Sequence, residues 1–76
     1  MRIMRDRGGR GGKVVTVIHG LSERGAALDA RASELRRFCG AGGAVKDGAI
    51  LIQGDHRERI AERLRALGFT VKLAGG

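Results

Sequence analysis

The residues of this chain best suited to chemistry are arginines and glycines near its N-terminus. Arg7 and Arg10 are each followed by two glycines, and Lys13 comes directly after the second pair. Residues 1–13 hold five basic side chains and one acidic side chain, so this segment has a charge of +4. Glycine lets the backbone approach a ligand closely, and guanidinium groups bind phosphate oxygens in pairs. Arg7, Arg10 and Lys13 are therefore candidate contacts for the phosphates of RNA.

The glycine-rich loop, residues 7–12, has two other interpretations. A phosphate-binding P-loop would need a glycine where Arg7 stands and a serine or threonine where Val14 stands, and it would precede a helix rather than a strand. The spacing therefore argues against a P-loop. A solvent-exposed connection without any ligand would have the same composition, so on charge alone it stays open beside RNA contact.

The whole chain is strongly basic. It has 15 Lys and Arg residues against 8 Asp and Glu residues, a net charge of +7 on 76 residues. Such a charge attracts polyanions, most often nucleic acid or an acidic membrane surface. Phe38 and Phe69 are the only aromatic residues, and we expect both in the core. Recognition through phosphates and shape is therefore expected, rather than base stacking.

No group of residues indicates catalysis or metal binding. Cys39 and two histidines are too few for a zinc site, and no Ser/His/Asp or Cys/His spacing suggests a nucleophile. A single cysteine cannot form an internal disulfide, which fits a reducing cytoplasm. No apolar run approaches the roughly 20 residues of a membrane span, and no secretory signal is visible. We expect a cytoplasmic protein without catalytic residues, cofactor, metal or membrane contact.

The elements that must position these residues follow from hydrophobic spacing. The length predicts one domain, residues 1–76. Strands are expected at residues 2–5, 13–19, 44–46, 49–53 and 69–73, and helices from about residue 22–25 to 39 and from 56 to 67. The order β-β-α-β-β-α-β predicts an α/β fold, an α+β sandwich in which two helices cover one face of a small sheet.

A tight hairpin turn fixes the expected register of the third and fourth strands. Asp47-Gly48 suits a two-residue turn with positive φ at both positions. This turn places Val45 opposite Ile50, with Ile52 on the same face, and all three are expected in the core. The other expected core residues are Val15, Val17, Leu28, Leu35, Ile60, Leu64 and Phe69.

Asp55 has a structural explanation that needs no ligand. It follows Gly54 at the end of a strand, and Glu58 stands three residues further on. We expect Asp55 to be the N-cap of the second helix, with Glu58 completing a capping box. Arg36 and Arg37 also have a structural explanation, because basic residues are favoured at the C-terminus of a helix.

Four segments, in order along the chain, resemble the Sui-type translation initiation factor 1 family. They are residues 13–21 (KVVTVIHGL), 38–45 (FCGAGGAV), 52–57 (IQGDHR) and 73–76 (LAGG). The tight Asp47-Gly48 turn is closer to the compact archaeal and bacterial members than to the eukaryotic ones. The resemblance implies a mixed sheet with two helices on one side.

The resemblance also implies a function. Members of this family bind the small ribosomal subunit near the P site and influence initiator tRNA accommodation and start-codon selection on mRNA. The loop at residues 7–12 would then approach ribosomal RNA, and Arg36 and Arg37 would add contacts. Gln53, Asp55 and Arg57 would belong to the segment associated with fidelity. We expect a monomer that is not an enzyme.

The sequence leaves two alternative functions open. One is a general RNA-binding regulator or repressor of translation that uses the same basic surface. The other is a small RNA-processing or tRNA-directed hydrolase, for which the sequence offers no candidate site.

Overall fold

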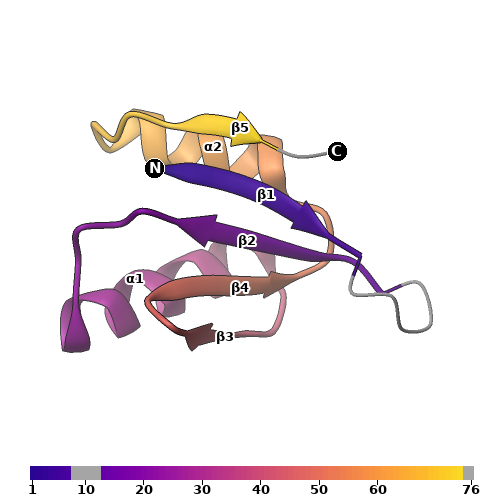
Figure 1. The fold of residues 1–76 in the computed structure, drawn as a ribbon, viewed down its shortest axis with the longest axis horizontal. Coiled ribbons are helices and arrows are strands. Elements are labelled where there is room, and N and C mark those ends of the chain that lie inside the picture. Colours follow the sequence, from indigo (N-terminus) through magenta and orange to yellow (C-terminus); the bar gives the residue numbers. More distant parts are fainter. Residues whose placement is uncertain (8–12, 75–76) are drawn as a thin grey trace.

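The protein is a five-stranded sheet with both helices on one face (Figure 1). This computed structural model describes residues 1–7 and 13–74. The strands are β1 (Arg2–Asp6), β2 (Val15–His19), β3 (Gly43–Lys46), β4 (Ala49–Gln53) and β5 (Lys72–Ala74), and the helices are α1 (Gly25–Cys39) and α2 (Arg57–Ala66). The α+β fold and the element order that we expected from the sequence are confirmed.

The sheet is mixed. Its strand order is β3-β4-β2-β1-β5, with β1 and β5 parallel and the other neighbours antiparallel. The first strand thus lies between the second and the last, while β3 and β5 form the two edges. Neither helix among the described residues is long and apolar enough to cross a membrane.

The face of β2 that meets the helices is not the expected one. We expected Val15 and Val17 to point into the core, but the side chains that do so are Thr16 and Ile18, both fully buried. Ile18 pairs with Ile3 and Ile50, which are also fully buried. Residues 14–18 are β-branched without a break, so the sequence shows no alternation that could select a face.

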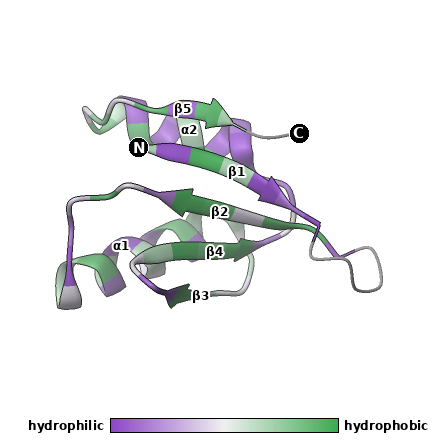
Figure 2. Ribbon diagram, viewed as in Figure 1, coloured by the Kyte–Doolittle hydropathy of each residue, from purple (hydrophilic) through white to green (hydrophobic). Residues whose placement is uncertain are grey.

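Val17 is buried as expected, with 8% of its surface exposed, but it lies on the face of the sheet opposite α1 and α2. It pairs with Met4 in β1 and Leu51 in β4. These side chains, with Ala49, form the apolar floor of a shallow depression of about 530 Å³. Figure 2 shows the mainly hydrophobic character of β2 and β4.

The core lies between the sheet and the two helices. Its buried members are Ile3, Ile18, Leu21, Leu28, Ala32, Leu35, Ile50, Ile52, Ile60, Ala61, Leu64 and Val71. Six of the expected core residues are in this cluster, and Phe69 is half-buried against it. Val45 pairs with Ile50 as expected, but it is 37% exposed because β3 is an edge strand.

The turns confirm the expected backbone geometry at three places. Asp47 and Gly48 have φ values of 51° and 76°, as the hairpin turn requires. Gly40 ends α1 in the left-handed region, with φ 63°. Gly68, with φ 96°, follows the C-cap Leu67 of α2. The last strand is shorter than expected and begins only at Lys72.

Candidate nucleic-acid interface

The turn between β4 and α2, residues 53–57, is hydrogen-bonded to the beginning of β2. The Thr16 hydroxyl donates to the Gly54 carbonyl oxygen at 2.6 Å and accepts from the His56 backbone N–H at 2.9 Å. The Gly54 N–H donates to the Val14 carbonyl oxygen at 2.8 Å. Thr16 is fully buried, so these contacts satisfy a polar group that would otherwise be costly inside the core. We call residues 53–57 the Gly54 turn.

Asp55 is not the N-cap of α2, and the expected capping box with Glu58 does not form. The helix begins at Arg57. Its N-cap residue is His56, whose side chain makes no capping hydrogen bond. Thr16, from a strand forty residues away in sequence, binds the His56 N–H instead. Local sequence rules could not predict this contact, because they consider only residues close to the helix end.

The Asp55 carboxylate lies between two arginines. It accepts from Arg57 Nε at 3.2 Å and from Arg5 Nη1 at 3.2 Å. Burial by itself raises the pKa of Asp55, but the hydrogen bonds from the Arg57 and Arg5 side chains and from the Arg57 backbone N–H lower it below its ordinary value. Asp55 therefore stays charged and connects the turn to β1.

The backbone at the centre of this turn favours glycine. Gly54 has φ 97°, and a Cβ there would lie 2.7 Å from Nε2 of His56. That imidazole nitrogen is 3.0 Å from the Gln53 carbonyl oxygen, so the ring folds back over the turn. The Gly54 turn is therefore compact, with its backbone and side chains bonded to one another.

The Gly54 turn lies beside the end of β1 and the start of β2, which flank the glycine-rich loop at residues 7–12, from here on called the basic loop (Figure 1). Arg5 is in β1 just before the loop, and Val14 and Thr16 come just after it. Arg7 and Lys13, the expected contacts at the two ends of the loop, are exposed. Arg10 lies outside the described residues.

Arg36 and Arg37 stand at the C-terminus of α1 with different surroundings. Arg36 is half-buried and donates to Ser33 Oγ at 3.1 Å and to the Gly43 carbonyl oxygen at 3.5 Å. Arg37 is exposed. The two arginines line a shallow depression of about 420 Å³ with Gly42, whose carbonyl oxygen accepts from the Gln53 N–H at 2.8 Å. This hydrogen bond links the segment that follows α1 to the first residue of the Gly54 turn.

Phe38 is at the surface, which corrects the expectation that both aromatic residues are in the core. Its side chain is 37% exposed. The guanidinium carbons of Arg59 and Arg63 lie 5.1 and 5.6 Å from the centre of its ring. The sequence contains a signal for this position, because Phe38 is about 100° around the helix from the inward stripe that ends in Cys39.

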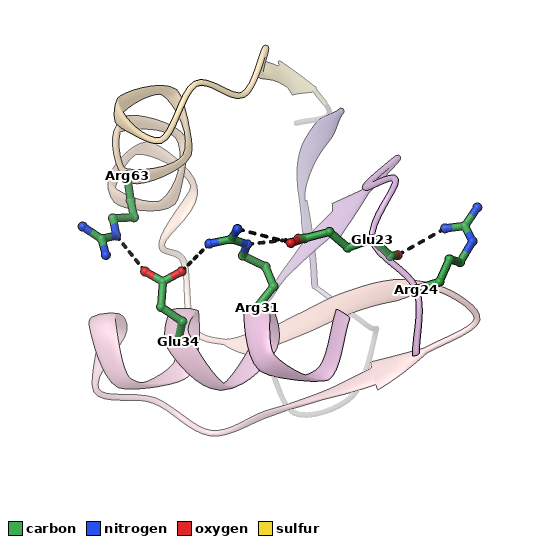
Figure 3. A network of polar contacts seen from close by, with 5 residues as sticks. All are labelled: Glu23, Arg24, Arg31, Glu34 and Arg63. Carbon is green, nitrogen blue, oxygen red and sulfur yellow. Dashed lines mark hydrogen bonds and ion pairs between the residues drawn. The ribbon is translucent and has the colours of Figure 1, made fainter. Parts of the chain in front are cut away.

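A chain of ion pairs between the two helices holds Arg63 (Figure 3). Glu34 Oε2 accepts from Arg63 at 2.7 Å, and its other oxygen accepts from Arg31 at 2.8 Å. Arg31 continues to Glu23 at 3.0 Å. Burial raises the pKa of Glu34, but its hydrogen bonds to Arg63 and Arg31 and their charges lower it below its ordinary value.

The described part of the chain contains no cluster of side chains suited to binding a metal ion. Within residues 1–7 and 13–74, no three His, Cys, Asp or Glu side chains are grouped as a metal ion would need. Cys39 packs against the core, as its place on the inward stripe of α1 predicts. Burial raises the pKa of its thiol, and the nearby charge of Arg59 opposes that shift.

The arrangement can be compared with known proteins. The family model described as translation initiation factor SUI1 matches residues 1–70. The chain is 51% identical over all 76 residues to the protein YciH of Salmonella typhimurium, of which it covers 70%. It is 52% identical over 60 residues, 79% of this chain and 60% of the other, to a protein translation factor SUI1 homolog of Sulfurisphaera tokodaii.

An archaeal relative from Methanopyrus kandleri carries the same name. It is 51% identical over 55 residues, which are 72% of this chain and 52% of that protein. The family model covers the sheet strands β1 to β4, both helices and the Gly54 turn. With this coverage and identity, the chain belongs to the SUI1 family of translation initiation factors.

Proposed function

We propose that this protein binds the small ribosomal subunit near the P site, as a monomer, and there influences initiator tRNA and start-codon selection. Membership of the SUI1 family supports a role in translation initiation. The site on the subunit and the effect on codon choice are our proposal. It is a binding role, in which the basic loop and the Gly54 turn act on RNA without catalysing a reaction.

The observation that carries this proposal is that the Gly54 turn is bonded to both strands that support the basic loop. Asp55 binds Arg5 in β1, and Gly54 and His56 bind Val14 and Thr16 at the start of β2. A loop that contacts RNA phosphates would therefore hold the Gly54 turn in a fixed place relative to that RNA. Phosphate contacts fix the register and orientation of a protein on nucleic acid.

The charges around the turn suit this role. Arg7 and Lys13 are exposed at the ends of the loop, and Arg37 is exposed at the end of α1. The chain as a whole has a net charge of +7. We propose that Arg7, Arg10, Lys13, Arg36 and Arg37 contact ribosomal RNA, while Gln53, Asp55 and Arg57 face the site where codon and initiator tRNA meet.

An initiation assay on AUG and UUG messages tests the effect on codon choice. The variant Asp55→Asn removes the charge that binds Arg5 and Arg57 but keeps the shape of the side chain. We expect it to bind the small subunit normally and to raise the ratio of UUG to AUG initiation. The variant Asp47→Asn, in the hairpin turn away from the loop, is the matched control. Equal ratios for wild type and Asp55→Asn would contradict a role of this segment in codon selection.

A general RNA-binding regulator is the second candidate, because a charge of +7 alone would support it. Co-sedimentation separates the two. Binding in one saturable step to small subunits supports the first proposal. Equal binding to large subunits and to unrelated RNA would favour the general regulator.

A further inference from the structure

Phe38 is an exposed ring in a protein with very few rings. The chain has two phenylalanines and no tryptophan or tyrosine, and the other phenylalanine packs against the core. Phe38 projects from the last turn of α1, 37% exposed. An exposed aromatic ring on a basic surface is the usual platform for an unstacked base of single-stranded nucleic acid.

Two arginines of α2 lie against this ring. Arg59 and Arg63 are four residues apart and so share one flank of the helix. Their guanidinium carbons are 5.1 and 5.6 Å from the ring centre. Glu58 and Glu62 each precede one of these arginines, which places them about 100° further round the helix, away from the ring. Glu34 pairs with Arg63 and balances one of the two charges. Arg59 and the exposed Arg37, which precedes Phe38 in the sequence, leave the charge beside the ring positive.

The two guanidinium groups are held in place. Arg59 Nη2 donates to the Phe38 carbonyl oxygen at 3.2 Å, and Arg63 Nε donates to Glu34 at 2.7 Å. Each guanidinium carries five N–H donors in a plane, so one such bond leaves the group able to bind a phosphate oxygen as well. A ring and two oriented guanidinium planes offer both a stacking surface for a base and donors for its phosphate.

This site is continuous with the Gly54 turn. Arg59 lines a depression of about 280 Å³ together with Asp55, His56, Arg57 and Glu58. A strand of RNA that contacts the turn would therefore reach Arg59 and Phe38 without leaving the protein surface. That continuity favours RNA over an acidic peptide, which would bind the arginines but has no general use for the ring.

We propose that Phe38, Arg59 and Arg63 form a binding site for one unpaired RNA nucleotide, with its base stacked on the Phe38 ring and its phosphate bound by the arginines. This inference rests on the proposed function, since it adds a contact to the same RNA-binding surface. It assigns to the α1–α2 side of the molecule a stacking contact that the composition of the chain does not suggest.

Tryptophan fluorescence tests the site directly. Because the chain has no tryptophan, Phe38→Trp creates a single emitter at the site. We expect titration with a hexa-adenylate oligoribonucleotide to quench its emission in a saturable way, as a stacked base does. Phe69→Trp, at the half-buried ring near Arg31, is the matched control and should keep most of its emission. Poly-glutamate should compete with the oligonucleotide without quenching.

A second variant keeps the proposal testable without tryptophan. Phe38→Leu preserves apolar volume but removes the ring. We expect it to lower affinity for a labelled hexa-adenylate by about fivefold or more, the lower end of what stacking on a ring contributes per base. Its thermal melt serves as the folding control. A lower melting temperature with unchanged affinity would show that the ring only ties the helices together, and would overturn the proposal. The proposal is also overturned if the emission of Phe38→Trp stays unquenched at oligonucleotide concentrations at which fluorescence anisotropy of the labelled hexa-adenylate shows that binding is saturated.

The same variants separate this inference from the proposed function. If wild type binds small subunits while Phe38→Trp stays unquenched by both subunits and oligonucleotide, the nucleotide site is wrong and the proposed function stands. If wild type fails to bind small subunits but hexa-adenylate quenches Phe38→Trp, the nucleotide site stands and the proposed function is wrong.

Discussion

The Thr16 hydroxyl donates a 2.6 Å hydrogen bond to the Gly54 carbonyl oxygen from a fully buried position in the core. The Thr16 hydroxyl oxygen also accepts a hydrogen bond from the His56 backbone N–H at 2.9 Å. One side chain of β2 thus closes the turn before α2. It also connects the turn to the strand that follows the basic loop.

Replacing Thr16 with valine tests this connection. Thr16→Val keeps the shape of the side chain but leaves the Gly54 carbonyl and the His56 N–H without their partner, so we expect a loss of about 1–3 kcal/mol in the free energy of unfolding. Urea denaturation measures it. Thr16→Ser keeps the hydroxyl, and Thr70→Val changes an exposed threonine. We therefore expect both variants to lose less free energy of unfolding than Thr16→Val. A Thr16→Val protein as stable as wild type would show that the hydroxyl contributes nothing.

Gly54 and Gly48 both have positive φ, but their surroundings differ. A Cβ at Gly54 would lie 2.7 Å from the His56 ring, whereas nothing lies within 4 Å of one at Gly48. Gly48→Ala should cost about 1–2 kcal/mol from backbone strain alone, and Gly54→Ala should cost more because of the added clash.

Removing the His56 ring separates the clash from the strain. In the double variant Gly54→Ala with His56→Ala, we expect the cost of the alanine at Gly54 to fall to that of Gly48→Ala, and a double-mutant cycle by chemical denaturation measures the coupling. Additive effects of the two substitutions would contradict the contact between the ring and the turn.

Ile52 and Val45 belong to the same hairpin face but differ in burial. Ile52→Ala is expected to cost about 2–5 kcal/mol, because Ile52 is fully buried and the variant leaves a cavity. Val45→Ala is expected to cost much less, because Val45 is on the edge strand and 37% exposed. Thermal melts of the two variants measure the difference. Similar losses would mean that Val45 packs in the core after all.

The acid stability of the protein is expected to depend on Glu34. Its pKa in the folded state is lowered from the ordinary value of 4.5, so the folded state binds fewer protons than the unfolded state in acid. The stabilisation is fully present above that ordinary value and is lost as the pH falls through the folded pKa. Glu34→Gln and Arg63→Gln should each flatten the stability curve in this window, measured by urea denaturation across acidic pH. Unchanged curves would contradict the role of the ion-pair chain.

The sequence was informative wherever the cause of a structure is local. Asp47-Gly48 predicts its hairpin and the pairing of Val45 with Ile50, because the turn type fixes the register. The apolar spacing of residues 28, 32 and 35 predicts the buried side of α1. Both features depend on neighbours within a few residues.

Contacts between distant parts of the chain were not predictable in this way. The inward face of β2 is selected by its partners Ile3 and Ile50, since every residue from 14 to 18 is β-branched. The contact of Thr16 with the Gly54 turn spans forty residues. At the candidate site, the neighbours of Asp55 and Phe38 come from β1 and α2, and no local pattern indicates them.

The central claim, that the basic loop binds RNA of the small subunit, is tested most directly by the salt dependence of binding. The triple variant Arg7→Ala, Arg10→Ala, Lys13→Ala is compared with Arg2→Ala, Lys46→Ala, Lys72→Ala, which loses the same charge from exposed sites. Co-sedimentation with small subunits over a salt series measures the slope of log affinity against log salt. We expect the slope of the loop variant to be smaller in magnitude than that of wild type by about 2–3, because each of the three residues contacts one phosphate. The control variant should keep the slope of wild type. Equal slopes for the two variants would contradict the account.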